Sequence, residues 1–420
     1  MSLADTLVIG AGVVGATTAY YLAREGIPTT VVDAASEVAL DTSFANGGLV
    51  TPTTAFPWSS PGSLKLMLQS MGREDSPLLL RLTDIPRLGS WGLRFALNCR
   101  PSKYRQSAKA LSTFATHSLQ ELTGLLAQRK VRYQVHEGGL LQIYRDEEGV
   151  RACRAYASFL QGMGVTYQLL DREAVVALEP SLLPISSSIR MGLLLPGDVW
   201  GDAREFALAV ESACRELAVE FRYGVKVTGL RVEHGHISGV ETDGGIIPAK
   251  QVVVCAGPAT PSLLKQHGLN APIQPVKGYS ITLRKADIGF LPNRPIVDDH
   301  AHLGVTPLGD RLRVAGTVEF AGEDRTVSAA RIANLTRALT GLFPGISIPE
   351  DVSAWAGLRP MTPDGLPIVD GTSIGGLYVN SGHGALGWTL ACGSADLLRR
   401  MIMGQDSPVS SPFRMDRRYW

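Results

Sequence analysis

The sequence predicts an α/β fold in which a doubly wound nucleotide-binding domain is interleaved with a second domain. Three observations lead to this prediction. A glycine-rich turn joins a strand pattern to a helix pattern near the N-terminus. The chain has 420 residues, more than the roughly 250 to 300 that one hydrophobic core usually serves. No repeat, low-complexity tract or obvious linker divides the sequence, so we expect the two domains to alternate along it.

Composition and charge exclude several classes of protein. Hydrophobic residues make up 45% of the chain and charged residues 19%, which is typical of globular proteins and unlike disordered or collagen-like chains. The 40 Lys and Arg residues nearly balance the 39 Asp and Glu residues, and a net charge of +1 provides no field that would attract nucleic acid. We therefore expect a small-molecule ligand and no nucleic-acid partner.

Cysteine and histidine usage bears on the compartment and on metal binding. The five cysteines are odd in number and widely spaced, which indicates a reducing compartment. The histidines lack metal-ligand spacing, so we expect no metal site. No Lys or Arg precedes the first apolar run, and glycines interrupt that run, so we expect a cytoplasmic protein without a secretory signal.

The glycine-rich turn contains Gly10, Gly12 and Gly15. In a dinucleotide-binding turn, one glycine makes the tight bend, one lets the backbone touch a pyrophosphate, and one allows close packing of helix on sheet. The helix that opens there directs free N–H groups at the phosphates. The next strand pattern, residues 29–32, ends in Asp33, whose carboxylate can accept hydrogen bonds from a ribose. The motif predicts a dinucleotide but does not choose between NAD and FAD.

Four further segments resemble a known family. Residues 41–48 (DTSFANGG) resemble the segment after the second strand in the D-amino acid oxidase (DAO) superfamily. Residues 277–280 (KGYS), 357–367 (GLRPMTPDGLP) and 381–389 (SGHGALGWT) are similar to the FAD-dependent D-amino acid dehydrogenases of bacteria within that superfamily, and the similarity extends over nearly the whole chain. The resemblance implies FAD as the cofactor.

The resemblance also implies the domain organisation, which is similar to that of glutathione reductase. A Rossmann-like FAD-binding domain would comprise residues 1–52, 203–270 and 352–420. It would be interleaved with an antiparallel-sheet substrate domain made of residues 53–202 and 271–351.

Hydrophobic periodicity places the main elements. It predicts amphipathic helices over residues 106–130 and 203–219 and a hairpin over 225–240. The family resemblance, more than periodicity, implies strands over 274–284 and 311–319 that would contribute to the sheet of the substrate domain.

The residues expected to contact FAD come from separate segments. In the superfamily, the segment around Val227 lies against the adenine, and Ala256 and Gly257 close the sheet beside the cofactor. A helix that opens after the glycine-rich run 381–387 would stabilise negative charge on a reduced flavin. The full set is Gly10, Gly12, Val13, Val14, Gly15, Asp33, Ala34, Thr42, Ser43, Asn46, Gly47, Gly48, Val227, Ala256, Gly257, Arg359, Gly382, His383, Gly384, Gly387, Trp388 and Thr389.

Arg359 is the principal candidate for substrate binding. Its Gly- and Pro-rich surroundings predict a rigid, irregular loop. A planar guanidinium suits bidentate capture of a carboxylate, and in the related amino acid oxidases an arginine at this position holds the substrate carboxylate. The alternative is a structural ion pair. Asp364, in a Pro-Asp-Gly sequence, is expected to order the loop.

Three other residues have two interpretations each, and a fourth bears on substrate size. Tyr279 would donate its hydroxyl to the substrate carboxylate, or is an ordinary strand tyrosine. Lys277 would attract the carboxylate or lie close to the flavin. His383 would add a hydrogen-bond donor at the flavin or cap its loop. Trp200 stands in a segment that lies near the substrate in the family, so its bulk would bear on the size of the substrate.

The predicted activity is oxidation of a D-amino or cyclic D-imino acid. Hydride would pass from the substrate Cα to flavin N5, and electrons would continue to a quinone or another carrier. The alternatives are a hydroxy-D-proline dehydrogenase, a sarcosine- or glycine-type oxidase, and a flavin-bearing electron-transfer subunit of a larger complex.

The segment 53–105 differs from the rest of the chain. It contains eight basic and three acidic residues, together with Trp, Phe and Leu in short runs separated by prolines. Basic residues with Trp and Leu on short helices suit a surface that rests on anionic lipid. This would place the protein peripherally on the inner face of the membrane. The alternative is an insertion packed on the substrate domain or against a partner subunit.

Overall fold

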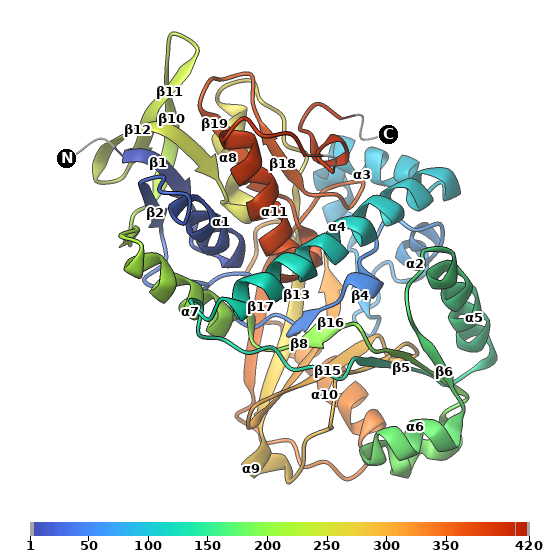
Figure 1. Ribbon diagram of the computed structural model, residues 1–420. Helices are drawn as coiled ribbons and strands as arrows, with labels where there is room; N and C mark the ends of the chain where they lie inside the picture. Colours follow the sequence, from blue (N-terminus) through green and yellow to red (C-terminus); the bar gives the residue numbers. More distant parts are fainter. Residues whose placement is uncertain (1–3, 408, 418–420) are drawn as a thin grey trace.

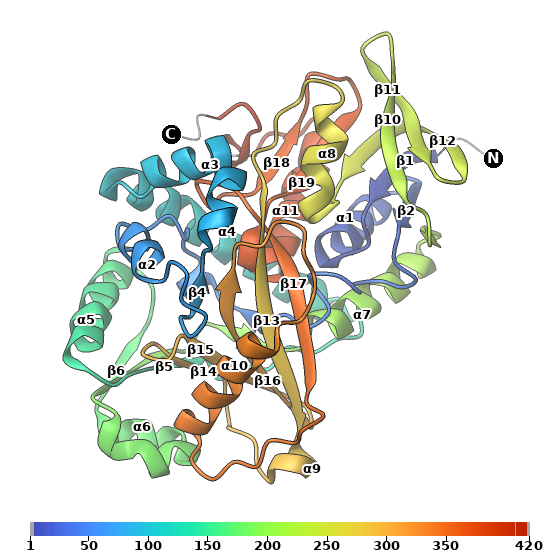
Figure 2. The ribbon, with the colours of Figure 1, turned by 180° about the vertical axis from the view of Figure 1, so that it is seen from behind.

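Two large sheets with helices packed on them form the structure, and the chain passes between the two sheets several times (Figures 1 and 2). The structure is a computed structural model that describes residues 4–407 and 409–417. Its combination of a parallel and a mainly antiparallel sheet confirms the predicted fold class.

The first sheet carries the glycine-rich turn. Its strands are β1 (Ala4–Ile9), β2 (Thr29–Asp33), β9 (Glu220–Tyr223), β10 (Val227–Glu233), β11 (His236–Thr242), β12 (Gly245–Val254), β18 (Ile368–Gly371) and β19 (Leu377–Ser381). The parallel part follows the order β9-β2-β1-β12-β19, and β18 pairs antiparallel with β19. β12 also continues into an antiparallel meander with β11 and β10.

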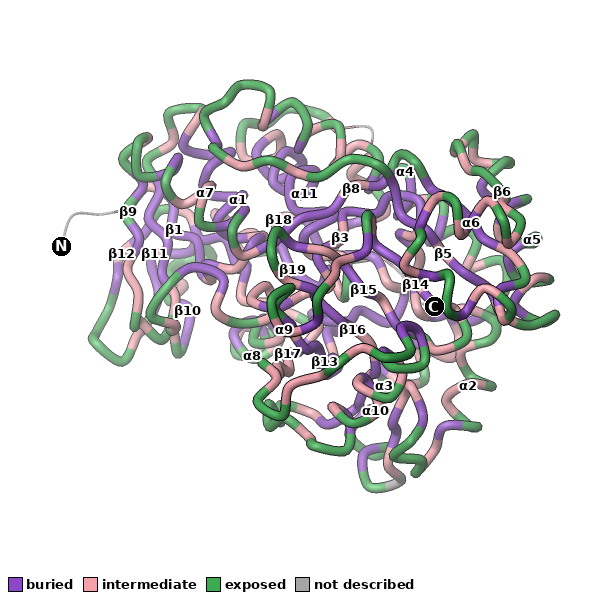
Figure 3. Tube along the Cα trace, turned by 90° about the horizontal axis from the view of Figure 1, so that it is seen from below, coloured by how far each residue is buried: buried purple, intermediate pink, exposed green. Residues whose placement is uncertain are grey.

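This parallel sheet is buried on both faces. In β1, Leu7 and Ile9 pack into one core and Val8 into another, because successive side chains of a strand point to opposite faces. The core on the Val8 side also contains residues of α1 (Val13–Ala23), α4 (Pro101–Ala127), α7 (Ala203–Glu216) and α11 (Gly387–Ile402). The core on the other side contains residues of α8 (Thr260–Lys265). Figure 3 shows buried residues following the strands of this sheet.

The second sheet is mainly antiparallel. Its strands are β4 (Leu78–Leu79), β5 (Leu140–Tyr144), β6 (Gln168–Leu170), β7 (Met191–Leu195), β13 (Gln274–Arg284), β14 (Ile296–Asp298), β15 (Leu303–Leu308), β16 (Arg311–Glu319) and β17 (Ser353–Met361). They follow the order β17-β13-β16-β15-β14-β5-β7-β6, and β4 pairs with β16. Helix α10 (Ala329–Leu342) packs against β13 and β16.

The remaining elements surround the second sheet or connect the two (Figure 2). They are the helices α2 (Ser63–Gln69), α3 (Ile85–Asn98), α5 (Glu147–Gly162), α6 (Arg172–Leu178) and α9 (Lys285–Ile288), and the strand pair β3 (Leu49–Val50) and β8 (Val199–Trp200).

Most elements predicted from the sequence are present. β13 and β16 have the expected bounds. The helix expected over 106–130 begins earlier, at Pro101, because proline suits the first turn of a helix, where N–H groups have no intrahelical acceptor. α7 begins at the expected residue because the Asp202 side chain accepts hydrogen bonds from two N–H groups of its first turn.

Packing departs from the expected domain boundaries at two elements. α4 lies within residues 53–202, yet its Leu111 and Phe114 belong to the core shared with α1 and α11. β17 lies within residues 352–420, yet it pairs with β13 of the antiparallel sheet. An amphipathic stripe or an apolar strand specifies that a face is buried, but not which sheet buries it.

The turn glycines give the first prediction. A Cβ on Gly15 would lie 1.8 Å from the carbonyl oxygen of Gly10, whereas a Cβ on Gly12 would meet only the Ser43 hydroxyl, at 3.5 Å. We expect Gly15→Ala to lower the Tm and release the dinucleotide, because α1 must move off the sheet. Gly12→Ala should keep the Tm of the apoprotein and weaken only dinucleotide binding. Thermal melts and flavin content after gel filtration check this, and unchanged flavin binding in both variants would contradict it.

Candidate active site

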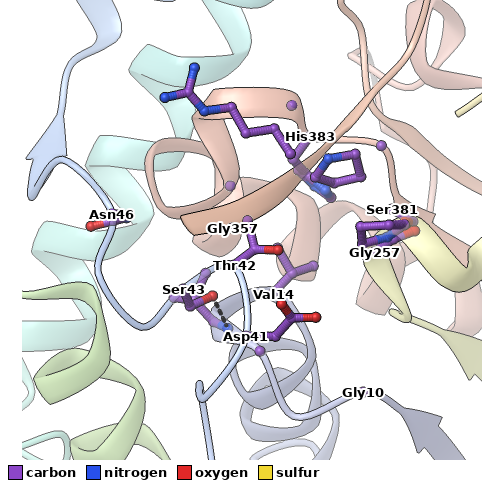
Figure 4. A pocket seen from close by; sticks show the side chains of 18 of the residues that line it. Gly10, Val14, Asp41, Thr42, Ser43, Asn46, Gly257, Gly357, Ser381 and His383 are labelled. Carbon is purple, nitrogen blue, oxygen red and sulfur yellow. Dashed lines mark hydrogen bonds between the residues drawn. The ribbon is translucent and has the colours of Figure 1, made fainter. Parts of the chain in front are cut away.

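A cavity of about 860 Å³ is lined by residues of both sheets. Figure 4 shows how they gather around it: Gly10 and Val14 from the first turn, Thr42, Ser43 and Asn46 from the segment after β2, and His383 from the segment before α11. The segments are far apart in the sequence. The carboxyl ends of parallel strands β1, β2 and β12 bring them together, as expected where an open α/β sheet binds a ligand.

One end of the cavity is the N-terminus of α1. Gly12 is the N-cap residue, and it has no side chain that could cap this helix end. The backbone N–H of Val13 donates to the Ser43 hydroxyl over 3.2 Å. The Asp33 carboxylate accepts hydrogen bonds from the N–H groups of Ala11, at 2.5 Å, and Ala35, at 2.7 Å. A carboxylate has about four acceptor positions, so Asp33 orders the turn and keeps capacity for a ribose.

All but two of the residues expected to contact FAD line this cavity. The lining members are Gly10, Gly12, Val13, Val14, Asp33, Ala34, Thr42, Ser43, Asn46, Gly47, Val227, Ala256, Gly257, Arg359, Gly382, His383, Gly384, Gly387, Trp388 and Thr389. Gly15 and Gly48 are not among the lining residues. Both are packing glycines instead, since a Cβ on Gly48 would lie 2.8 Å from the Gly201 carbonyl oxygen and its φ is +72°.

Several buried polar atoms around the cavity have no hydrogen-bond partner among the described residues. They are Oδ1 of Asn380, Nε2 of His383 and Nε1 of Trp388. Burial lowers the pKa of His383 to about 3, so the imidazole is neutral at neutral pH. Because buried polar groups normally find partners, these atoms indicate that a polar ligand completes the site. The cavity volume, the open helix end and these atoms fit a flavin dinucleotide.

Arg359 also lines the cavity, but not from a loop as expected. It lies in β17, opposite Val276 of β13, because the strand pairing continues through the neighbouring Pro360. Its guanidinium lies 5.1 Å from the ring centroid of Trp58 and occupies the space that a side chain at Gly278 would fill. Within the described part of the chain it has no ion pair or hydrogen bond. Burial lowers its pKa to about 10, which still leaves it charged at neutral pH.

Tyr279 and Lys277 are held by protein groups. The Tyr279 ring lines the cavity, but its hydroxyl donates to Glu319 Oε2 over 2.5 Å rather than being free for a substrate. Lys277 is fully buried and donates to Asp324 Oδ2 at 2.6 Å and to the Thr326 carbonyl at 3.0 Å. The contact of Tyr279 agrees with its second interpretation, an ordinary strand tyrosine, and the contacts of Lys277 are to protein groups rather than to the cavity.

Trp200 and Asp364 have structural surroundings. Trp200 is buried, stacks on His136 with 5.6 Å between ring centroids, and does not line the cavity. Its bulk therefore does not limit the ligand there. The Asp364 carboxylate accepts hydrogen bonds from the Leu366 N–H and from Arg417, which orders the loop after β17.

Sequence reasoning missed the part of the cavity wall formed by Phe56, Pro57 and Trp58, two of which are aromatic. The segment is anchored by Thr53, whose N–H and hydroxyl both donate to the Asp198 carboxylate, at 3.3 and 2.5 Å. The Tyr156 hydroxyl donates to the Thr53 carbonyl. The available signal was the aromatic residues just after the FAD-binding segment, which composition alone assigned to a surface role.

Asp198 gives a pH-dependent prediction. Burial raises its pKa to about 7, above the value of about 4 expected in the unfolded chain. Between these values the folded state binds the extra proton, so this group lowers the free energy of unfolding by up to about 1.4 kcal/mol per unit rise in pH. Asp198→Asn cannot ionise and should lack this contribution. Urea unfolding between about pH 5 and 7 checks it; parallel pH dependences for wild type and variant would contradict it.

Among the described residues, His117, Glu121 and Asp396 form the one group close enough to hold a metal ion together. The Asp396 carboxylate already accepts hydrogen bonds from Arg399 and Arg400, and Glu121 accepts one from a tyrosine. These donors explain the cluster as an ion-pair network.

The fold, the dinucleotide-type turn and the cavity define a flavin-dependent oxidoreductase. The model of the family described as FAD dependent oxidoreductase (DAO) matches residues 5–401. The chain therefore belongs to this family, which confirms the resemblance seen in the sequence, and FAD is its cofactor.

Individual relatives agree. The chain is 41% identical over 415 residues to a D-amino acid dehydrogenase of Methylobacterium sp. (strain 4-46), covering 98% of each chain. It is 42% identical to a D-amino acid dehydrogenase of Methylobacterium nodulans, covering 96% of each. Among solved structures, glycine oxidase from Bacillus cereus aligns with a TM-score of 0.74 and 22% identity over 99% of both chains, which shows the shared fold.

Proposed function

We propose that this protein oxidises a D-amino or cyclic D-imino acid to the imino acid, which water hydrolyses to the 2-oxo acid when the substrate is linear. The observation that carries the proposal is the unpaired guanidinium of Arg359 at the FAD cavity. A partly buried cation that has no counter-charge among the described residues favours binding of an anion, and a planar guanidinium matches a carboxylate. The names of the relatives support D-amino acids as the substrate class.

The chain's own residues position the substrate. Arg359 would hold the carboxylate, and the Trp58 ring together with the bare backbone of Gly278 would keep the guanidinium in place. Bound FAD supplies the two-electron acceptor for the hydride that leaves Cα. The neutral imidazole of His383 and the backbone N–H groups at the N-terminus of α11 would provide hydrogen-bonding groups on the cofactor side of the cavity.

The experiment is anaerobic mixing of the flavin-loaded protein with D- and L-amino acids. D-amino acids should bleach the flavin absorbance and L-enantiomers should not; equal reduction by both would contradict the proposal. Arg359→Lys and Gly278→Ala should each raise KM about tenfold, near 1.4 kcal/mol of binding, with FAD retained. Gly304→Ala is the matched control, because its Cβ would meet only ordinary contacts at 3.7 Å or more. Unchanged KM in Arg359→Lys would make Arg359 structural.

The electron acceptor is proposed to be a quinone or another carrier rather than oxygen. The relatives named as dehydrogenases support this, and a peroxide assay during aerobic turnover separates a dehydrogenase from an oxidase.

The helices within residues 4–407 and 409–417 include no candidate for a membrane-spanning segment.

We further propose that the segment 53–105 rests on anionic lipid at the cytoplasmic face of the membrane. Leu68 on α2 and Leu93 on α3 are 69% and 65% exposed, although both helices also contribute buried residues or cavity walls. The excess of basic residues complements an anionic surface. Part of that charge is neutralised within the protein, since Arg73 pairs with Asp75 and Arg81 with Glu319.

Vesicle flotation tests this surface. The protein should float with anionic vesicles at low salt and less at high salt, because the screening length shortens as salt increases. Leu68→Glu with Leu93→Glu should abolish flotation while turnover of a soluble substrate stays unchanged. Failure of the wild type to float with anionic vesicles at low salt would favour a partner subunit or an insertion that serves only packing.

A further inference from the structure

A second cavity of about 500 Å³ adjoins the FAD cavity. The two cavities share six lining residues, which are Thr54, Phe56, Pro57, Trp58, Arg359 and Met361. Arg359 therefore stands at the junction of the two. A ligand whose carboxylate is bound there can extend one part toward FAD and another part into the second cavity.

The wall of the second cavity is mostly apolar. It comprises Leu66 and Met67 of α2, Leu78 of β4, Trp91 and Phe95 of α3, Val276 of β13, Val318 of β16, and Phe320. No carboxylate or lysine is among its lining residues. Trp91 and Phe95 stack with 5.2 Å between ring centroids.

The polar atoms in this wall are largely bonded to the protein itself. The Trp91 Nε1–H donates to the Met361 carbonyl over 2.9 Å. The Ser60 and Ser63 hydroxyls bond to each other at 2.7 Å, and Ser63 also donates to the Trp58 carbonyl. Thr317 Oγ1 is buried without a hydrogen-bond partner among the described residues, and His302 also lines the cavity. The cavity consequently offers a ligand mainly apolar contact, with few groups free for hydrogen bonds.

A β-bulge shapes the wall. The register between β13 and β16 pairs Gly278 with Val318 and Tyr279 with Gly316, so Thr317 is an extra residue, and its φ is +49°. In a regular strand only alternate residues would face one side. The bulge explains why Gly316, Thr317 and Val318 all line the cavity.

From this arrangement we infer that the second cavity holds the substrate's side chain and selects D-amino acids with large apolar side chains, aromatic ones included. The inference rests on the proposed function. A cavity of about 150 Å³ already holds benzene, so this one has room for a phenyl or indole group. A methyl side chain would leave most of the apolar wall without contact, and its substrate would gain little binding energy there.

The first measurement compares kcat/KM for D-phenylalanine and D-alanine with an artificial dye acceptor. The kcat/KM of the wild type should be at least about tenfold higher for D-phenylalanine than for D-alanine. Each methylene group that an apolar pocket buries raises kcat/KM by about tenfold or more. A preference for D-alanine would overturn the inference while leaving the proposed function standing.

Neighbouring residues of α2 provide a matched pair of variants. Met67 lines the cavity, whereas Leu68 is 69% exposed and does not. Met67→Trp should lower kcat/KM for D-phenylalanine about tenfold or more and for D-alanine less than about threefold. Leu68→Trp should change neither. Val318→Phe fills the cavity from the sheet side and should reproduce Met67→Trp, which guards against a fault in the folding of α2.

Binding without turnover separates this inference from the proposed function. 3-Phenylpropanoate and propanoate both carry a carboxylate for Arg359, and flavin absorbance changes report their binding. The wild type should bind 3-phenylpropanoate at least about tenfold more tightly, and Met67→Trp should remove the difference. This result would support the cavity's role whether or not D-amino acids reduce the flavin. Failure of every D-amino acid to reduce the flavin would refute only the proposed function.

Two results would overturn the inference. One is equal binding of the two acids, and the other is a set of cavity variants that change only the KM of a quinone acceptor.

Discussion

The partly buried positive charge of Arg359, which has no acidic partner within the described ranges, is the constraint on which the site depends. Burial disfavours a charged guanidinium and lowers the pKa of Arg359 to about 10, yet it stays charged at neutral pH. The residues around the guanidinium do not neutralise its charge. Gly278 leaves room for the guanidinium, and Trp58 presents a ring face, which attracts a cation without cancelling its charge. Glu319, on the same sheet, is already occupied by Tyr279 and Arg81.

The walls of both cavities depend in turn on how the segment 53–105 is anchored. Arg331 of α10 is fully buried and donates hydrogen bonds to the carbonyls of Glu74, Ser76, Pro77 and Val318. Backbone dipoles thus take the place of a counter-ion and join the segment to the edge of β16. With the hydrogen bonds of Thr53 to Asp198 at its start, the segment forms part of the walls of both cavities. Its aromatic residues turn inward, while Leu68 and Leu93 remain outside.

The sequence predicted correctly a feature whose geometry is specified by a local motif. The spacing of Gly10, Gly12 and Gly15 was sufficient for the turn, because its requirements concern neighbouring backbone atoms. The sequence did not identify hydrogen-bond partners. It left two interpretations open for Tyr279 and two for Lys277, and in the structure β16 and the segment after it bring Glu319 and Asp324 to these side chains. Nothing in residues 277–280 encodes that pairing, since the partners lie about forty residues away and reach them only through the sheet register.

The sequence by itself predicted the α/β class and the dinucleotide turn, because local spacing and residue chemistry within one segment are enough for these. The FAD family, and Arg359 as the candidate for substrate binding, followed from the resemblance of several segments to a known family. Only the tertiary structure decided that Arg359 lies in a strand with no ion-pair or hydrogen-bond partner in the part of the chain described, that the Trp58 ring lies beside its guanidinium, and that a second apolar cavity opens beside it. Each of these depends on burial and on distances between remote segments, which arise when the two sheets pack together and which no single stretch of sequence contains.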